Sequence, residues 1–187
     1  MTWKYLLELP LNKEAFTALL NRGVHPNFKN LHKRLNVESS RVYNKLVRLL
    51  SAVSYWSPIF AEVEFMPRLM LPFIKLISTD DLLVFEIILS LIVQWMQVWF
   101  EAFPSEPASV VQAIDHIVRT EDPRLSSHLS QLGLGCKLYA WPLMTNFFAD
   151  VLPKEDWLKL IDNLFINKHD PELLVYFCAS FIINNKH

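Results

Sequence analysis

The fold is decided by one apolar stretch, residues 82–100, which reads LLVFEIILSLIVQWMQVWF. Glu86 is its only charged residue. At a helical period every face of this segment is apolar, and such a helix lies either in a protein interior or in a bilayer. Because the stretch is long enough to cross hydrocarbon, the surrounding sequence has to separate the two environments.

Several features favour the protein interior. Glu86, Gln94 and Gln97 are polar side chains that would be costly in lipid. The flanks are acidic and hold no Lys/Arg cluster that would anchor one end of a span. Thr79 or Asp80 is a natural N-cap for a helix that begins in water. We therefore expect a central helix that the rest of the chain buries.

Composition indicates one globular domain. The chain has 187 residues, of which 52% are hydrophobic and 20% charged, enough to bury a sizeable core. A net charge of −1 selects neither nucleic acid nor membrane as a partner. Cys136 and Cys178 lie in apolar stretches, so we expect buried free thiols in a reducing compartment. Lys4 and Glu8 interrupt any apolar signal-peptide core.

The remaining segments read as amphipathic helices, several of which open with proline. We expect helices over residues 12–22, 26–35, 39–56, 67–77, 82–100, 108–119, 122–132, 141–151, 153–165 and from 170 onward. Sustained period-two alternation is absent, so the predicted class is all-α. Trp95 and Trp99 are expected in the core. The segment Pro104–Pro107 predicts a boundary between lobe 1 (residues 1–103) and lobe 2 (residues 104–187).

Catalytic and metal-binding patterns find little support. His25 and His32 are seven residues apart, but no carboxylate or thiol joins them as a metal-ligand set. No Gly-rich phosphate loop occurs in the sequence, and His116 and His128 have the surroundings of ordinary helix residues. We expect no metal and no cofactor.

One segment is strongly basic. Residues 22–48 carry seven bases and a single acid, Glu38. These bases are either a solvated outer face of two helices or a surface for an acidic protein, a phosphoinositide headgroup or a nucleotide-bearing partner. Few aromatics interleave with them, so nucleic acid is not expected. The partner-binding candidates are Lys29, Lys33, Arg34, Arg41 and Lys45.

A family pattern emerges from Leu125 onward. It comprises His128-Leu129, Gly133, YAWPL at 139–143, Phe147-Phe148, Leu152-Pro153, Trp157 and LIDNLF at 160–165. In order and spacing this resembles the second half of a TBC domain, the family that contains the GTPase-activating proteins (GAPs) of Rab GTPases. With a weaker first half, the resemblance covers nearly the whole chain. It implies a multi-helix array with two helical lobes in a V, and a Rab-type GTPase as partner.

One branch of the family matches further. Residues 9–16 (LPLNKEAF), Gly23, His25-Pro26 and residues 139–143 resemble a WD-repeat TBC protein of centrosomes and centriolar satellites. This resemblance implies that the chain is a fragment of a larger cytoplasmic protein. It also implies a centrosomal scaffold as an alternative partner and a role in ciliogenesis.

Active family members insert two side chains, called fingers, into the GTPase site. One is an arginine in an Ile-x-x-Asp-x-x-Arg motif and the other a glutamine in a Tyr-x-Gln motif. Here residues 57–66 place Glu64 at the glutamine position and Glu62 at the tyrosine position. A carboxylate adds like charge beside the γ-phosphate and cannot donate a hydrogen bond. The nearest match to the arginine motif is LNVESSR at 35–41. Its arginine, Arg41, is a weak finger candidate, because its spacing to Glu64 is shorter than the family's.

We therefore expect a catalytically inactive TBC domain that serves as an interaction module. The alternative is an active GAP that uses a non-standard arginine, Arg41 or Arg68. A third interpretation is a membrane-surface module that uses the basic helices, although we do not expect membrane contact.

Overall fold

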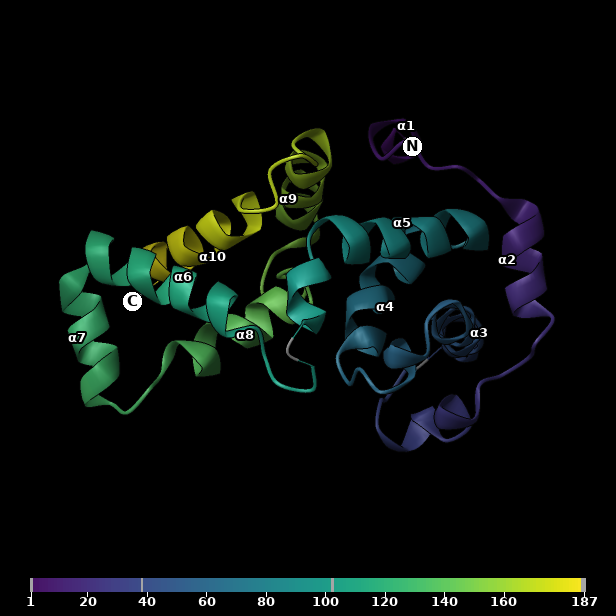
Figure 1. Ribbon diagram of the computed structural model, residues 1–187, viewed down its shortest axis with the longest axis horizontal. Coiled ribbons are helices and arrows are strands. Elements are labelled where there is room, and N and C mark those ends of the chain that lie inside the picture. Colours follow the sequence, from purple (N-terminus) through teal and green to yellow (C-terminus); the bar gives the residue numbers. More distant parts are fainter. Residues whose placement is uncertain (1, 38, 102, 186–187) are drawn as a thin grey trace. The chain divides into compact units, whose positions relative to one another are not determined.

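The computed structural model describes residues 2–37, 39–101 and 103–185, and its regular elements there are all helical (Figure 1). The α-helices are α1 (Trp3–Leu6), α2 (Lys13–Leu20), α3 (Ser40–Trp56), α4 (Met66–Leu76), α5 (Asp81–Gln94), α6 (Ala108–Glu121), α7 (Pro123–Gln131), α8 (Cys136–Thr145), α9 (Lys154–Ile166) and α10 (Leu173–Asn184). Short 3-10 helices are η1 (Pro26–Phe28), η2 (Leu31–Lys33), η3 (Pro58–Ala61) and η4 (Gln97–Phe100). The all-α prediction is confirmed. Within the described residues, every helix is too short or too polar to cross a bilayer.

The helix starts follow the capping signals in the sequence. Asn12, Ser39, Asp80 and Asp122 each accept a hydrogen bond from the backbone N–H three residues later, at 2.9–3.4 Å. These bonds satisfy donors that a helix start leaves open. Gly23 adopts φ +79° after α2, a conformation that favours glycine.

The chain forms two compact units, Met1–Ser90 and Leu91–His187. Their boundary falls inside α5, before the residue-103 boundary that the proline-rich segment suggested. The division into lobes 1–103 and 104–187 stays a prediction, as does a V-shaped arrangement. In the first unit α3 packs against α2 and α4, and its Leu46, Leu49 and Leu50 are almost fully buried.

The apolar stretch is buried as predicted but is not one helix. In α5, Val84, Ile87, Ile88 and Leu91 are fully buried. The helix ends at Gln94 and is followed by a turn and by η4, so the expected continuous helix over 82–100 is wrong. At that end the amide groups of Trp95 and Met96 both donate to the carbonyl of Leu91, which closes the last turn. Two valines, Val93 and Val98, are exposed.

The only charge of that stretch is buried and fully bonded. Glu86 is 5% exposed. Its Oε2 accepts from the Leu11 amide at 2.8 Å and its Oε1 from the Asn12 amide at 2.7 Å. Because a buried carboxylate needs such donors, Glu86 fixes the chain just before α2 against α5. Leu11 is held there at φ +50°, an unusual conformation for leucine.

The second unit is built around aromatic side chains. Trp95 contacts Phe165 at 5.8 Å between ring centroids, and Trp99 contacts Trp141 at 5.0 Å. Both tryptophans are nearly buried, which confirms their predicted core positions. α10 packs against α6 and α8.

Two further predictions concern the second unit. Cys136 and Cys178 are buried free thiols as expected, and burial raises the pKa of both. The helix predicted over 141–151 is instead α8 (Cys136–Thr145). Phe147 and Phe148 adopt φ +51° and +63°, which is incompatible with continuing the helix.

Candidate functional site

The segment at the predicted glutamine-finger position is an exposed acidic turn, Glu62–Glu64, between η3 and α4. Glu62 and Glu64 are both exposed, and Val63 between them is buried. The Asn27 side-chain amide donates to the carbonyl of Ala61 at 3.2 Å and to Oε1 of Glu62 at 2.8 Å. The turn thus presents carboxylates, which accept hydrogen bonds but cannot donate one to water.

The acidic turn is tied to the basic segment through one asparagine. Nη2 of Arg34 donates to the backbone carbonyl of Asn27 at 2.9 Å, and Asn27 in turn donates to Glu62. This places a guanidinium within two hydrogen bonds of the acidic turn. Arg34 is therefore linked to the predicted finger position through two hydrogen bonds. The sequence motif had instead singled out Arg41 as the candidate finger.

The weak arginine-finger candidate lies elsewhere on α3. The backbone N–H of His25 donates to Ser51 Oγ at 2.9 Å, so η1 adjoins the second half of α3. Asn27, which belongs to η1, donates to Glu62 of the acidic turn. Arg41 is near the start of α3, ten residues before Ser51, which corresponds to about 15 Å along a helix axis. It is exposed and lines a cleft beside α2 and the start of α5. The structure does not bring Arg41 and the acidic turn together.

Three of the predicted partner-binding bases form an exposed group. Lys29, Lys33 and Arg34 follow or belong to the 3-10 helices η1 and η2, and their side chains are solvent-exposed. We call these three residues the basic surface. The sequence predicted one short helix here, and the structure has two 3-10 helices instead. The acid of this segment, Glu38, lies outside the described residues.

Lys45 does not belong to that exposed group. It is 9% exposed, and its Nζ donates to the Ile77 carbonyl at 2.6 Å and pairs with Asp81 Oδ1 at 2.9 Å. Burial lowers the pKa of Lys45, and the nearby Arg48 cation lowers it further. Lys45 therefore connects α3 to the start of α5, and its role in partner binding stays a prediction. Its helical spacing to buried Leu49 was the sequence signal that it faces inward.

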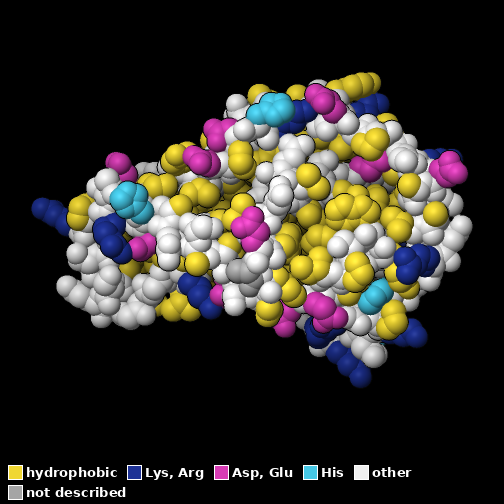
Figure 2. All heavy atoms as spheres, viewed as in Figure 1, with side chains coloured by type: hydrophobic (Ala, Val, Ile, Leu, Met, Phe, Trp, Pro, Cys, Tyr) yellow, Lys and Arg dark blue, Asp and Glu magenta, His cyan; other side chains and the backbone are white. Residues whose placement is uncertain are grey.

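Two further bases of the segment, Arg48 and Arg22, also have partners. Arg48 forms an ion pair with Asp81. The Arg22 guanidinium lies over the Tyr55 ring, 4.1 Å from its centroid. The charge excess in the sequence is thus distributed over several local interactions. On the face drawn in Figure 2, basic and acidic side chains are interspersed.

Metal ligation gains no support from the geometry. Across the described ranges, no group of three or more His, Cys, Asp or Glu side chains is arranged to hold a metal ion. His25 has its ring against Tyr55 at 5.2 Å between centroids, and its Nδ1 accepts from the Asn27 amide. It is a packed residue of the first unit.

Comparison with known proteins identifies the family. Residues 9–187 match the family model described as the Rab-GTPase-TBC domain. The chain belongs to the TBC domain family. The resemblance in the sequence is thereby confirmed, and Rab GTPases are the proteins that TBC domains typically bind.

Its relatives are much longer than this TBC domain. TBC1 domain family member 31 of Homo sapiens is 41% identical over 95% of this chain, and that of Oryzias latipes is 38% identical over 97%. The matched regions cover 16% and 17% of those two proteins. The chain therefore spans about one-sixth of the length of these relatives. No solved structure matches it.

Proposed function

We propose that this TBC domain is a catalytically silent interaction module that binds a Rab-type GTPase or a centrosomal scaffold protein without accelerating GTP hydrolysis. The observation that carries the proposal is the exposed pair Glu62 and Glu64 at the position of the glutamine segment. Two carboxylates there add negative charge next to a triphosphate and supply no donor for water.

The arrangement of the arginines supports the same conclusion. An arginine finger contributes about 10³ to 10⁵ in rate, and it does so by touching the transferring phosphoryl group. Arg41 lies ten residues, or about 15 Å along the axis of α3, from Ser51, the residue that holds the start of η1. Arg34 is linked to the acidic turn through Asn27, but its guanidinium donates to the Asn27 carbonyl.

The test is GTP hydrolysis by a panel of Rab proteins, with and without an excess of the domain. We expect no acceleration. A rise of about 100-fold or more, equivalent to about 2.7 kcal/mol of barrier, would overturn the proposal. Loss of that rise in Arg41→Ala or Arg68→Ala, with an unchanged melting temperature, would establish the alternative, an active GAP with a non-standard finger.

Binding is tested separately, by pull-down against GTP-locked and GDP-locked Rab proteins. Because the basic surface is exposed, Lys29→Glu with Lys33→Glu should weaken capture, and added salt should do the same. Lys75→Glu, an exposed base on α4, is the matched control. Capture that ignores both reversals would place the partner on another surface.

The cellular setting is proposed from the resemblance of residues 9–16 and 139–143 to the centrosomal branch of the family. We place the protein in the cytoplasm at centrosomes or centriolar satellites, with a role in cilium formation. Imaging the full-length protein with a centriole marker tests this, and a distribution unrelated to centrioles would contradict it.

A further inference from the structure

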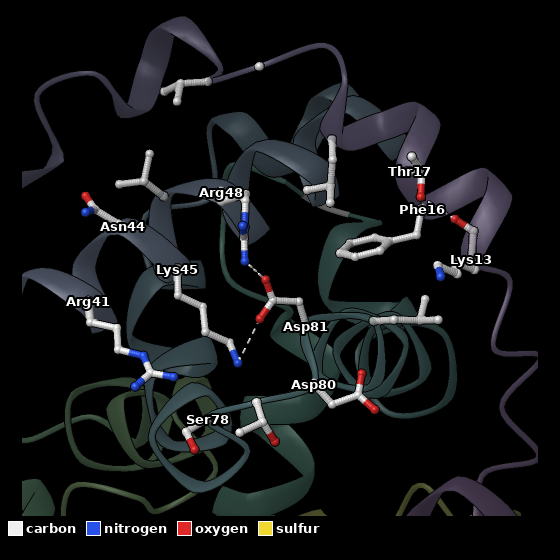
Figure 3. A pocket seen from close by; sticks show the side chains of 16 residues that line it. Lys13, Phe16, Thr17, Arg41, Asn44, Lys45, Arg48, Ser78, Asp80 and Asp81 are labelled. Atoms are coloured by element: carbon white, nitrogen blue, oxygen red, sulfur yellow. Dashed lines mark hydrogen bonds and ion pairs between the residues drawn. The ribbon is translucent and has the colours of Figure 1, made fainter.

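A second feature of the first unit is an open cleft of about 1290 Å³. It lies between α2, the first half of α3, and the loop Ser78–Asp80 that leads into α5 (Figure 3). We call it the charged cleft. It is formed by different residues from the acidic turn and the basic surface, so a ligand can bind in it whether or not the domain is catalytically silent or binds a Rab protein.

One wall of the charged cleft is fixed by an ion-pair cluster. Asp81 pairs with Lys45 at 2.9 Å through Oδ1 and with Arg48 through Oδ2, as the dashed lines in Figure 3 show. The Lys45 ammonium also holds the Ile77 carbonyl. These contacts join α3 to the α4–α5 loop, so the wall is preorganised.

The charge of the cleft is positive. Its lining includes the four bases Lys13, Arg41, Lys45 and Arg48, but only two acids, Asp80 and Asp81. Both acids are already engaged. Asp81 is shared by two cations, and Asp80 accepts from the Leu83 amide at 2.9 Å to cap α5. The cleft therefore attracts a negative group.

Arg41 is an exposed cation of the charged cleft for which the described residues show no ion pair with the lining acids. It is exposed at the start of α3, and Figure 3 shows its guanidinium on the side of the cleft that Lys45 lines. After burial and Arg48, Arg41 is a further cause that lowers the pKa of Lys45, which places its positive charge close to the cluster. A guanidinium in this setting binds a carboxylate through two parallel hydrogen bonds.

The remaining lining is mixed: Thr17, Asn44, Ser78 and Thr79 are polar, and part of the lining is apolar. Phe16 and Leu20 of α2 and Val47 of α3 contribute to it, and Val24 after α2 is 48% exposed. An exposed valine in the lining is a surface on which an apolar side chain removes area from water. Because a phosphate or an inositol headgroup has no apolar part, this half of the cleft favours a peptide.

We propose that the charged cleft binds an acidic, apolar peptide segment of a partner protein, in which Asp or Glu lies close to a large apolar residue. The carboxylate pairs with Arg41, and the apolar side chain packs against Val24 and Leu20. This assigns a docking site for a linear segment, formed by different residues from the basic surface proposed above to bind a GTPase.

The experiment selects a random dodecapeptide phage library on the immobilised 187-residue chain, with the Arg41→Glu protein as counter-selection. We expect the enriched peptides to share an acidic residue within a few positions of Leu, Ile or Phe. Labelled copies of these peptides are then titrated by fluorescence anisotropy. Arg41→Glu and Val24→Asp should each weaken binding about tenfold or more.

Controls keep the result interpretable. Arg41 and Val24 are exposed, so circular dichroism and melting of both variants should match the unchanged chain. Lys75→Glu, outside the cleft, should bind the peptides normally. The proposal is overturned if no acidic, apolar pattern is enriched, if Lys75→Glu binds as weakly as Arg41→Glu, or if phosphatidylinositol-bisphosphate vesicles displace the peptides through Arg41 and are unaffected by Val24→Asp.

Discussion

At the scale of single residues, Glu86 ties α5 to the segment that precedes α2. It is the one acid inside the apolar stretch, and both of its oxygens accept backbone amide hydrogens from the segment before α2. Charge-assisted bonds to a buried carboxylate are stronger than neutral ones. The same contacts hold Leu11 at a positive φ, so removing them releases a backbone conformation that leucine does not favour.

We therefore predict that Glu86→Gln lowers the free energy of unfolding by about 1–3 kcal/mol, because the amide nitrogen cannot accept from the second backbone donor. Urea unfolding measures the change, and hydrogen exchange at Leu11 and Asn12 should accelerate. Glu64→Gln, at an exposed position, is the matched control and should change little. Equal stability of the two variants would show that the buried carboxylate is not holding this segment.

Single residues also show that local contacts could be predicted from the sequence, whereas long-range contacts could not. Asn12 and Asp122 cap helices at the predicted starts, and Asp80 is one of the two caps expected for α5, because capping depends on neighbours within three positions of the chain. Lys45 was assigned to a partner surface because its charge alone suggested exposure. Its partners, Ile77 and Asp81, are more than thirty residues away, and only the fold brings them to it.

At the scale of elements, α5 was predictable in position and burial but not in length. The sequence has no Gly or Pro between Gln94 and Phe100, so nothing local signals an end. The chain turns there, and Trp95 and Trp99 pack on Phe165 and Trp141 of later helices. Long-range aromatic packing overrides a continuous helical pattern in this stretch.

The burial of α5 gives a direct test. Ile88→Ala should destabilise the chain by about 2–5 kcal/mol, since Ile88 is fully buried and the substitution leaves a cavity. Val93→Ala, in the same helix but 55% exposed, should lower the free energy of unfolding by only about a few tenths of a kcal/mol. Thermal or urea unfolding measures both. A similar loss of stability in the two variants would mean that α5 does not have one buried face and one exposed face.

At the scale of the whole molecule, the three candidate interaction sites share one unit. The acidic turn, the basic surface and the charged cleft all lie within Met1–Ser90. The second unit, Leu91–His187, contributes an aromatic core. This division separates the candidate recognition sites from the aromatic packing, so substitutions that test binding in the first unit leave the core of the second unchanged.

The position of the boundary between the units can be tested with fragments of the chain. The sequence placed it after residue 103, whereas the compact units meet at Ser90 and Leu91. A fragment of residues 104–187 lacks Trp95 and Trp99, whose burial against later aromatics is worth about 3–5 kcal/mol per side chain. We expect this fragment to lose cooperative thermal unfolding and to bind a hydrophobic dye, whereas residues 91–187 keep a cooperative transition. Identical melting of the two fragments would support the boundary at residue 103 and show that residues 91–103 are not needed for the aromatic core.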